Sequence, residues 1–396
     1  MTDRLMVGCG ARPCACNTQA MTSGDIADTL ECAAWNKRAA SLDSLTGLRF
    51  FAALVVLLRH SVPELFPLPG LQELSLVGPI GVGFFFVLSG FILTWTWKPH
   101  RTLRDFYIGR LTRIGPLHVL TTIVAAGLLI AAGTPHWLST ILSLFLLQAW
   151  GTENMRSGGN GPSWSLSVEV FFYLCFPFLV RPLFGATIRR CVTIGFGAAA
   201  GMLLWTIAYG AGSQMDLPAI TVFSTYTNPL YRLGEFVIGI CLAVAMRKGW
   251  RIRMSLPRAT LLAVAGYIGL ALANWGVMHA GVHLGDTKGL PLGVLDLAYL
   301  PMTVLLIAAA AASDIAGLPS ALRGRWMVSL GKWSFALYLI QMIVIAQVTK
   351  FAQPGVSWLG AFLLVGTILV CIAMSALLYR FIERPLESGM KQRLAR

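Results

Sequence analysis

Residues 48–62 read LRFFAALVVLLRHSV, and this stretch decides the fold. It is apolar enough to belong to a membrane span, yet it contains Arg49 and His60. Charged and titratable side chains are costly inside a bilayer, so they are expected where they have a function. At the rise of an α-helix the two lie about 16 Å apart along the axis, and eleven residues are close to three turns. The stretch therefore predicts a membrane helix that lines a site with a cation and a proton carrier.

The whole chain has the composition of a polytopic membrane protein. Of its 396 residues, 56% are hydrophobic and only 12% are charged. This charged fraction is about half that of an ordinary soluble domain. The formal net charge of +14 could suggest a nucleic-acid partner, but the basic residues lie in short loops between apolar segments. Nucleic acid is therefore excluded as a partner, and the expected partner is the lipid bilayer.

Ten apolar segments are long enough to span a bilayer, which takes about 20 residues. They run over residues 48–66, 79–97, 114–133, 164–182, 191–210, 228–246, 259–278, 295–312, 333–350 and 358–380. A further apolar piece, 136–150, is short for a span and suits a re-entrant or interfacial helix. If it does not cross, most of the 31 basic residues collect on one side, which the positive-inside rule assigns to the cytoplasm. The predicted fold class is all-α: one bundle of about ten transmembrane helices with both termini cytoplasmic.

The chain is expected to have three parts. Residues 1–43 lack the apolar core of a signal peptide and are predicted to form a disordered cytoplasmic tail. Residues 44–388 form the membrane domain, and residues 389–396 form a basic cytoplasmic tail. The cysteines of the first part match no zinc pattern, and the loop histidines near residue 280 are interpreted as solvated. No metal site is therefore expected.

Two arginines open the third span from the cytoplasmic side. Arg110 and Arg113 are three residues apart, so they share one helical face. Arginines at such places often only satisfy the positive-inside rule, and their side chains reach toward the headgroups. A guanidinium also forks onto phosphate oxygens, so the pair is equally suited to clamp phosphates. The spacing leaves both interpretations open.

One carboxylate lies inside the fourth span. Glu169 is about two turns in from the outer face, at a depth close to that predicted for His60. A His–Glu pair is the smallest general-base arrangement, because the carboxylate orients the imidazole and supports its charged form. The alternative is a structural ion pair of Glu169 with Arg59 or Arg232. Arg232 and Glu235 open the sixth span three residues apart, so they can also pair with each other.

Seven pieces of this chain, in order between about residue 44 and residue 388, resemble the integral membrane acyltransferase 3 family. They are LTGLRFFAALVVLLRH (45–60), FFFVLSGFILTW (84–95), FYIGRLTRIGPLH (106–118), GPSWSLSVEVFFYL (161–174), NPLYRLGEFVIG (228–239), LGKWSFALYLIQ (330–341) and YRFIERPL (379–386). The resemblance implies about ten core helices, an acyl-coenzyme A donor on the cytoplasmic side and an essential histidine at His60. It also implies roles for Arg49, Arg110 and Arg113.

The predicted function is a membrane O-acyltransferase of the bacterial inner membrane, in which His60 takes the proton of an acceptor hydroxyl. A transient acyl-histidine is the covalent variant, and the sequence leaves both open. The candidate residues are, as catalytic, His60 and Glu169; as donor-binding, Arg49, Arg110 and Arg113; and as acceptor-binding, Trp164, Ser165, Arg232 and Glu235. The expected partners are acyl-coenzyme A, with acetyl implied by the resemblance, and a saccharide or lipid-linked sugar. A second copy of the chain, forming a homodimer, is a further candidate partner, and no tightly bound cofactor is expected.

The chain departs from the family's pattern at two positions. Gly83 stands where the family often has an acidic residue, and Gln341 stands where it often has a histidine. Arg380, Glu383 and Arg384, at the end of the last span, are interpreted chiefly as an anchoring network, with contact to the coenzyme as the alternative. The alternative function is a proton-coupled transporter, since buried Arg, His and Glu also line proton paths. No inverted repeat of the kind found in transporters is visible in the span pattern. The motifs also favour the enzyme.

Overall fold

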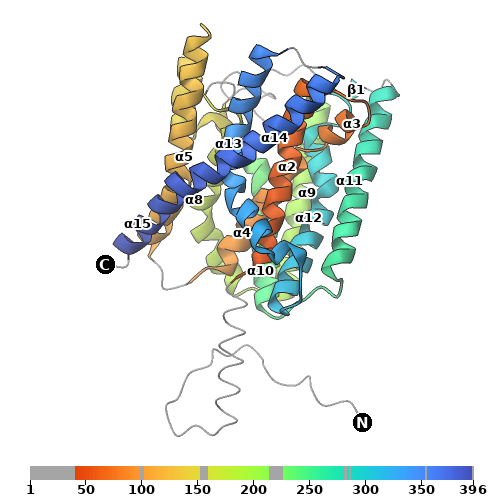
Figure 1. The fold of residues 1–396 in the computed structure, drawn as a ribbon. Coiled ribbons are helices and arrows are strands. Elements are labelled where there is room, and N and C mark those ends of the chain that lie inside the picture. The colour runs from red at the N-terminus through yellow and green to blue at the C-terminus, as the bar shows by residue number, and fades with distance from the viewer. Residues whose placement is uncertain are drawn as a thin grey trace, which may run out of the picture.

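The computed structural model describes residues 41–98, 102–151, 159–213, 226–280, 283–284, 287–352 and 355–394. Ten helical segments in this part of the chain are long and apolar enough to cross a membrane, as the sequence predicts. Their helices are α2 (Asp43–Leu65), α4 (Ile80–Trp95), α5 (Leu103–Ala131), α8 (Trp164–Phe184), α9 (Ile188–Ser213), α10 (Pro229–Arg247), α11 (Leu256–His279), α12 (Leu292–Ile315), α13 (Arg325–Phe351) and α14 (Trp358–Leu378). They form one bundle, with α5 at one edge, α11 at the opposite edge, and α2 and α4 between them (Figure 1).

The connecting elements are short. They are α3 (Leu71–Leu76), α6 (Trp137–Leu144), the 3-10 helices η1 (Gln148–Trp150), η2 (Gly161–Ser163) and η4 (Ala321–Arg323), the strands β1 (His283–Leu284) and β2 (Thr287–Lys288), the π-helical turn η5 (Tyr379–Glu383) and α15 (Arg384–Leu394). The two strands pair antiparallel as a hairpin, and the described fold is otherwise helical. The all-α prediction is confirmed.

The apolar piece 136–150 does not cross the bundle. Its one α-helix, α6, has eight residues, so it is about 12 Å long, far shorter than a span. The piece is anchored at the start of α8, where Gln148 Nε2 donates to the Ser163 carbonyl oxygen (2.9 Å). The carbonyl oxygen of Ser143 also accepts from His118 Nε2 of α5 (2.8 Å). The prediction of a short, non-crossing helix is confirmed.

Contacts between helix ends define the two ends of the bundle. The start of α2 binds the end of α12, because the Ser44 N–H and Oγ donate to the Asp314 carboxylate (2.8 and 2.7 Å). At the same end Arg247 of α10 donates to the Trp95 carbonyl oxygen at the end of α4 (2.6 Å). We name this end the near face. The opposite end, where α2 finishes at Leu65, is the far face.

Helices α4 and α10 lie at the centre of the bundle. In the most apolar window of each span, 78% of the residues are buried, against 11% for α9 at the periphery. The two helices approach through glycines: a Cβ at Gly90 would collide with the Phe236 carbonyl oxygen, and one at Gly239 with that of Val87. Small residues allow such backbone contact between membrane helices. Gly81 does the same for α4 against α2, at the Ala52 carbonyl oxygen.

Several expectations fall on residues outside the described part of the chain. These are the disordered tail, apart from its last few residues, with its four cysteines; the last two residues of the basic C-terminal tail; and Asp286 of the loop near residue 280. The fold therefore leaves the predicted domain bounds as predictions. In the described residues, no group of three or more His, Cys, Asp or Glu is arranged to hold a metal ion.

Candidate functional site

Two cavities lie one after the other along α2, and they contain most of the predicted site residues. The first has a volume of about 850 Å³ including its mouth. Its lining comes from five helices: Arg49 of α2; Val82, Phe85, Phe86, Leu88, Ser89 and Ile92 of α4; Arg110, Arg113 and Ile114 of α5; Ser165, Leu166, Glu169 and Tyr173 of α8; and Ser334, Phe335 and Tyr338 of α13. We name it the arginine cavity. Apart from its charged and hydroxyl groups, its walls are apolar.

The arginine cavity brings together the three predicted donor-binding residues. Arg110 lies with its guanidinium carbon 6.0 Å from the centre of the Tyr173 ring, a cation–π distance. Arg113, one turn further along α5, and Arg49 of α2 interact electrostatically with each other. Three like charges around one cavity are costly unless an anion neutralises them. The arrangement therefore suits an anionic ligand that enters among the arginines.

Two carboxylates face these arginines. Glu169 of α8 and Glu383 of the π-helical turn η5 both interact electrostatically with Arg49 and Arg113. Glu383 is almost completely buried, at 8% exposure. π-Helical turns are rare and often occur at functional sites. The sequence favours an anchoring role for Glu383 and gives no sign of this interaction with Arg49 and Arg113.

Glu169 does not pair with His60. Its Oε1 accepts from the Tyr173 hydroxyl one helical turn away and from Ser89 Oγ of α4 (3.4 Å). It lines the arginine cavity, whereas His60 lines the second cavity, beside the start of α8. The predicted His–Glu pair is therefore wrong. The two residues lie at different depths. Pro162 lines the same cavity as His60, and Glu169 lies about 10 Å further along the helix, well toward the near face.

The second cavity, which we name the histidine cavity, has a volume of about 520 Å³ including its mouth. It is lined by Val56, Arg59 and His60 of α2, Pro79 and Val82 at the start of α4, Gly161, Pro162 and Trp164, Tyr226, and Tyr338 and Met342 of α13. The side chain of Gln341 lies beside the His60 ring. Gln341 itself is held by α13, since its Nε2 donates to the Tyr338 carbonyl oxygen (3.2 Å). Gln341 thus occupies the place beside His60 that Glu169 was predicted to have.

Aromatic rings form one wall of the histidine cavity. The Trp164 and Tyr226 rings lie 5.0 Å apart, centre to centre. Tyr226 precedes α10, and burial, followed by the nearby Asp296, raises the pKa of its phenol well above the usual range. The hydroxyl therefore stays protonated. Flat aromatic faces beside polar groups suit a ligand that has both apolar and hydroxyl surfaces.

The two cavities meet at Val82 and Tyr338, because both residues line both cavities. Tyr338 is held in place by a hydrogen bond from its hydroxyl to the Pro162 carbonyl oxygen (3.0 Å) and by an edge contact with the Phe85 ring. A group that passed directly from one cavity to the other would pass these two side chains. Neither residue is among the predicted site residues, although Tyr338 lies in the motif LGKWSFALYLIQ (330–341).

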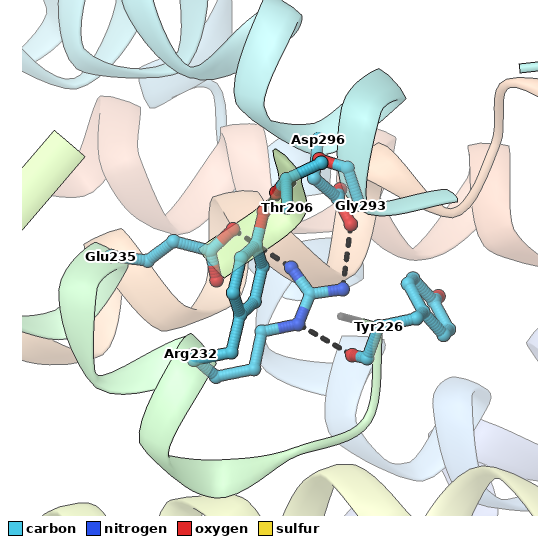
Figure 2. A network of polar contacts seen from close by, with 7 residues as sticks. Thr206, Tyr226, Arg232, Glu235, Gly293 and Asp296 are labelled. Atoms are coloured by element: carbon cyan, nitrogen blue, oxygen red, sulfur yellow. Dashed lines mark hydrogen bonds and ion pairs between the residues drawn. The ribbon is translucent and has the colours of Figure 1, made fainter. Parts of the chain in front are cut away.

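Arg232 and Glu235 line neither cavity. Arg232 donates to Glu235 at 2.8 Å, which confirms the predicted pair, and to Asp296 of α12 at 2.6 Å. Figure 2 shows the guanidinium between the two acidic residues, with Nε donating to the Tyr226 carbonyl oxygen (2.6 Å). Arg232 is completely buried. These residues hold the wall that carries Tyr226, so the geometry favours a supporting role over the predicted contact with acceptor. Of the other predicted acceptor-binding residues, Trp164 lines the histidine cavity and Ser165 the arginine cavity.

Residues 42–376 match the profile of the acyltransferase domain of the acyltransferase 3 family, which is most of the chain. The chain belongs to this family of membrane acyltransferases, and it is an acyltransferase. Family membership supports the enzyme over the alternative of a proton-coupled transporter.

Three relatives cover most of the chain. Acyltransferase MdmB of Streptomyces mycarofaciens is 31% identical over 374 residues, which cover 88% of this chain and 92% of that protein. Exopolysaccharide production protein ExoZ of Rhizobium meliloti is 28% identical over 321 residues, or 78% of this chain and 90% of that protein. Nodulation protein 10 of Rhizobium leguminosarum bv. viciae is 25% identical over 362 residues, which cover 85% of this chain and 91% of that protein. No solved structure shows significant similarity to the chain.

Proposed function

We propose that this acyltransferase moves an acyl group, acetyl in the first instance, from acyl-coenzyme A to a hydroxyl of a saccharide or another surface or secreted acceptor. The observation that carries the proposal is the order of the two cavities along α2. A cluster of three arginines suits the phosphates of coenzyme A, and a histidine suits the activation of a hydroxyl. The cavities share the lining residues Val82 and Tyr338, and in the proposal the thioester at the end of the pantetheine arm reaches His60 past them.

The charge distribution supports a cytoplasmic near face. The described basic residues at that face include Arg104, Arg181, Arg189, Arg190, Arg247, Lys248, Arg251, Arg253, Arg258, Arg323 and Arg325. The far face has few, Lys350 among them. By the positive-inside rule the near face lies in the cytoplasm, where acyl-coenzyme A is made. We therefore propose a bacterial inner-membrane protein with both termini cytoplasmic and the acceptor arriving at the far face.

In the proposed reaction the arginines bind and the histidine moves a proton. Arg49, Arg110 and Arg113 hold the phosphates, while Glu169 and Glu383 limit the net positive charge and orient the guanidinium groups. His60, with Gln341 beside it, takes the proton of the acceptor hydroxyl as its oxygen attacks the thioester carbonyl carbon. The name of ExoZ, a protein of exopolysaccharide production, supports a saccharide acceptor.

Acyl transfer by the purified protein tests the proposal. The protein in lipid nanodiscs is given acetyl-coenzyme A labelled in the acetyl group and a series of alkyl glycosides, and labelled products are identified by mass spectrometry. We expect label on a glycoside hydroxyl with the wild-type protein and none with His60→Ala. The matched control is His136→Ala, because His136 is exposed and lines neither cavity. Transfer by the His60 variant at the wild-type rate would contradict the mechanism.

A further inference from the structure

Arg59 precedes His60 on α2, and both side chains line the histidine cavity. The arginine is close enough to His60 and to Tyr226 to interact electrostatically with both. It does not line the arginine cavity, where the three proposed donor-binding arginines lie. Its place beside the proposed general base therefore needs an explanation of its own.

Arg59 forms no hydrogen bond or ion pair with any residue that the structure describes. The carboxylates that could neutralise it are engaged elsewhere. Glu169 accepts from Ser89 and Tyr173 in the arginine cavity. Glu235 and Asp296 both bind Arg232, at 2.8 and 2.6 Å. A guanidinium at this depth without a counter-charge is costly, unless it meets negative charge during the reaction.

A snorkelling arginine is the simplest alternative, because Arg59 is six residues from the end of α2, about 9 Å along the helix. Packing argues against it. The base of the side chain is enclosed by the turn before α4, where a Cβ on Gly78 would lie 2.8 Å from Arg59 Cβ. The side chain continues into the wall of the histidine cavity among Trp164 and Tyr226. Arg59 therefore lies at the cavity, within electrostatic range of His60 and Tyr226.

We propose that the Arg59 guanidinium stabilises the oxyanion that forms when the acceptor hydroxyl attacks the thioester beside His60. The inference rests on the proposed function. In the attack, the hydroxyl oxygen bonds to the carbonyl carbon, its proton passes to His60, and the carbonyl π electrons move onto the oxygen, which becomes the oxyanion. In the collapse, the C=O bond reforms, the C–S bond breaks, and the leaving thiolate takes the proton from His60. A fixed guanidinium donates hydrogen bonds and charge to that oxygen at no reorganisation cost.

Kinetics of Arg59 variants in nanodiscs test the inference. The probes are acetyl-coenzyme A and the best alkyl glycoside acceptor, and the released coenzyme thiol is measured by disulfide exchange. Loss of one oxyanion donor lowers kcat about 10²- to 10³-fold in enzymes where it has been removed. We expect a fall of this size for Arg59→Gln, a smaller fall for Arg59→Lys, and KM values for both substrates within about threefold of wild type. Free guanidinium ion should partly restore Arg59→Ala.

The control is Lys350→Gln, which removes a cation at the far end of α13 that lines neither cavity and should leave the kinetics unchanged. A raised KM for the glycoside with unchanged kcat would mean that Arg59 binds the acceptor, and it would overturn the inference. Activity that only follows the amount of folded protein would identify a snorkelling residue, with the same consequence. If Arg59→Gln does not accumulate, the kcat of Arg59→Lys decides. A wild-type protein that releases no thiol with any acceptor would instead contradict the proposed function, and this inference with it.

Discussion

Replacing Arg113 separates a phosphate clamp from a topology signal. Arg113 lines the arginine cavity with Arg49 and Arg110, and the acidic groups that face them are Glu169 and Glu383. These five residues carry three positive and two negative formal charges. Arg113→Lys keeps this balance but replaces the planar fork by a point charge. Arg113→Gln removes both the fork and the charge. The two variants therefore divide the contribution of geometry from that of charge.

We expect Arg113→Lys to weaken donor binding more than it lowers the maximal rate. A hydrogen bond to a charged group contributes about 1.5–3 kcal/mol, which corresponds to about a ten- to a hundredfold change in affinity. Arg113→Gln should be weaker still, because the remaining positive and negative charges cancel. Affinity is measured by titrating acetyl-coenzyme A against protein in nanodiscs at matched concentration. The control is Arg181→Lys in α8, which lines neither cavity.

Dephospho-coenzyme A identifies the phosphate that Arg113 contacts. This ligand lacks the 3′-phosphate, so a contact to that group is already absent with the wild-type protein. If Arg113 binds the 3′-phosphate, the wild type and Arg113→Lys should differ for coenzyme A and agree for the dephospho form. If it binds the pyrophosphate, the difference should persist for both. Unchanged donor affinity in Arg113→Lys and Arg113→Gln, with activity that follows protein level, would refute the clamp.

Three further outcomes are expected. Arg232→Met should lower the free energy of unfolding by about 3–5 kcal/mol, and with it the amount of folded protein, because it leaves two buried carboxylates without their cation. A monodisperse variant with the wild-type Tm would contradict this. Val82→Ala should raise kcat/KM for butyryl-coenzyme A relative to acetyl-coenzyme A, because Val82 lines both cavities. Val87→Ala is the control and should not change this ratio, because Val87 is buried on the same helix and lines neither cavity. Asn154 follows the non-crossing piece 136–150 and lies outside the described residues; the sequence predicts that this loop is extracytoplasmic. A cysteine there should react with a membrane-impermeant thiol reagent in intact spheroplasts, and reaction only after lysis would contradict the proposed orientation.

The helices could be predicted closely because each has a strong local signal. A span needs about 20 apolar residues, and this pattern can be read one segment at a time. The non-crossing piece 136–150 followed from its length and from the distribution of basic residues. The contacts between helices carry no such signal. The π-helical turn that places Glu383 near Arg113 depends on how α14 ends and packs, which no local periodicity indicates.

Most of the residues that the sequence named do line the two cavities, whereas the predicted pairing of Glu169 is wrong; the roles of these residues stay predictions. Arg49, Arg110 and Arg113 do line one cavity, and His60 lines a cavity further along α2. The error concerned Glu169, since equal depth was counted along two separate helices. Tyr173 lies four residues after Glu169, within reach on the same face, and the structure has them hydrogen-bonded. Spacing within a helix was therefore the better guide.

Gly83 and Asp296 show how a departure from a family pattern can be understood once the neighbours are known. The resemblance implies that an acidic side chain often stands at position 83. In this structure a Cβ at Gly83 would lie 2.8 Å from Glu235 Oε1 and 3.2 Å from Asp296 Oδ1. A carboxylate at position 83 would thus point to the same place as Asp296, which binds Arg232 from α12. The buried arginine binds two carboxylates, Glu235 of α10 and Asp296 of α12, so adding Asp at position 83 would crowd the cluster with a third negative charge. The lone Asp296 in the apolar span at 295–312 was the sequence signal for this partner, because a buried carboxylate in a membrane helix requires a cation.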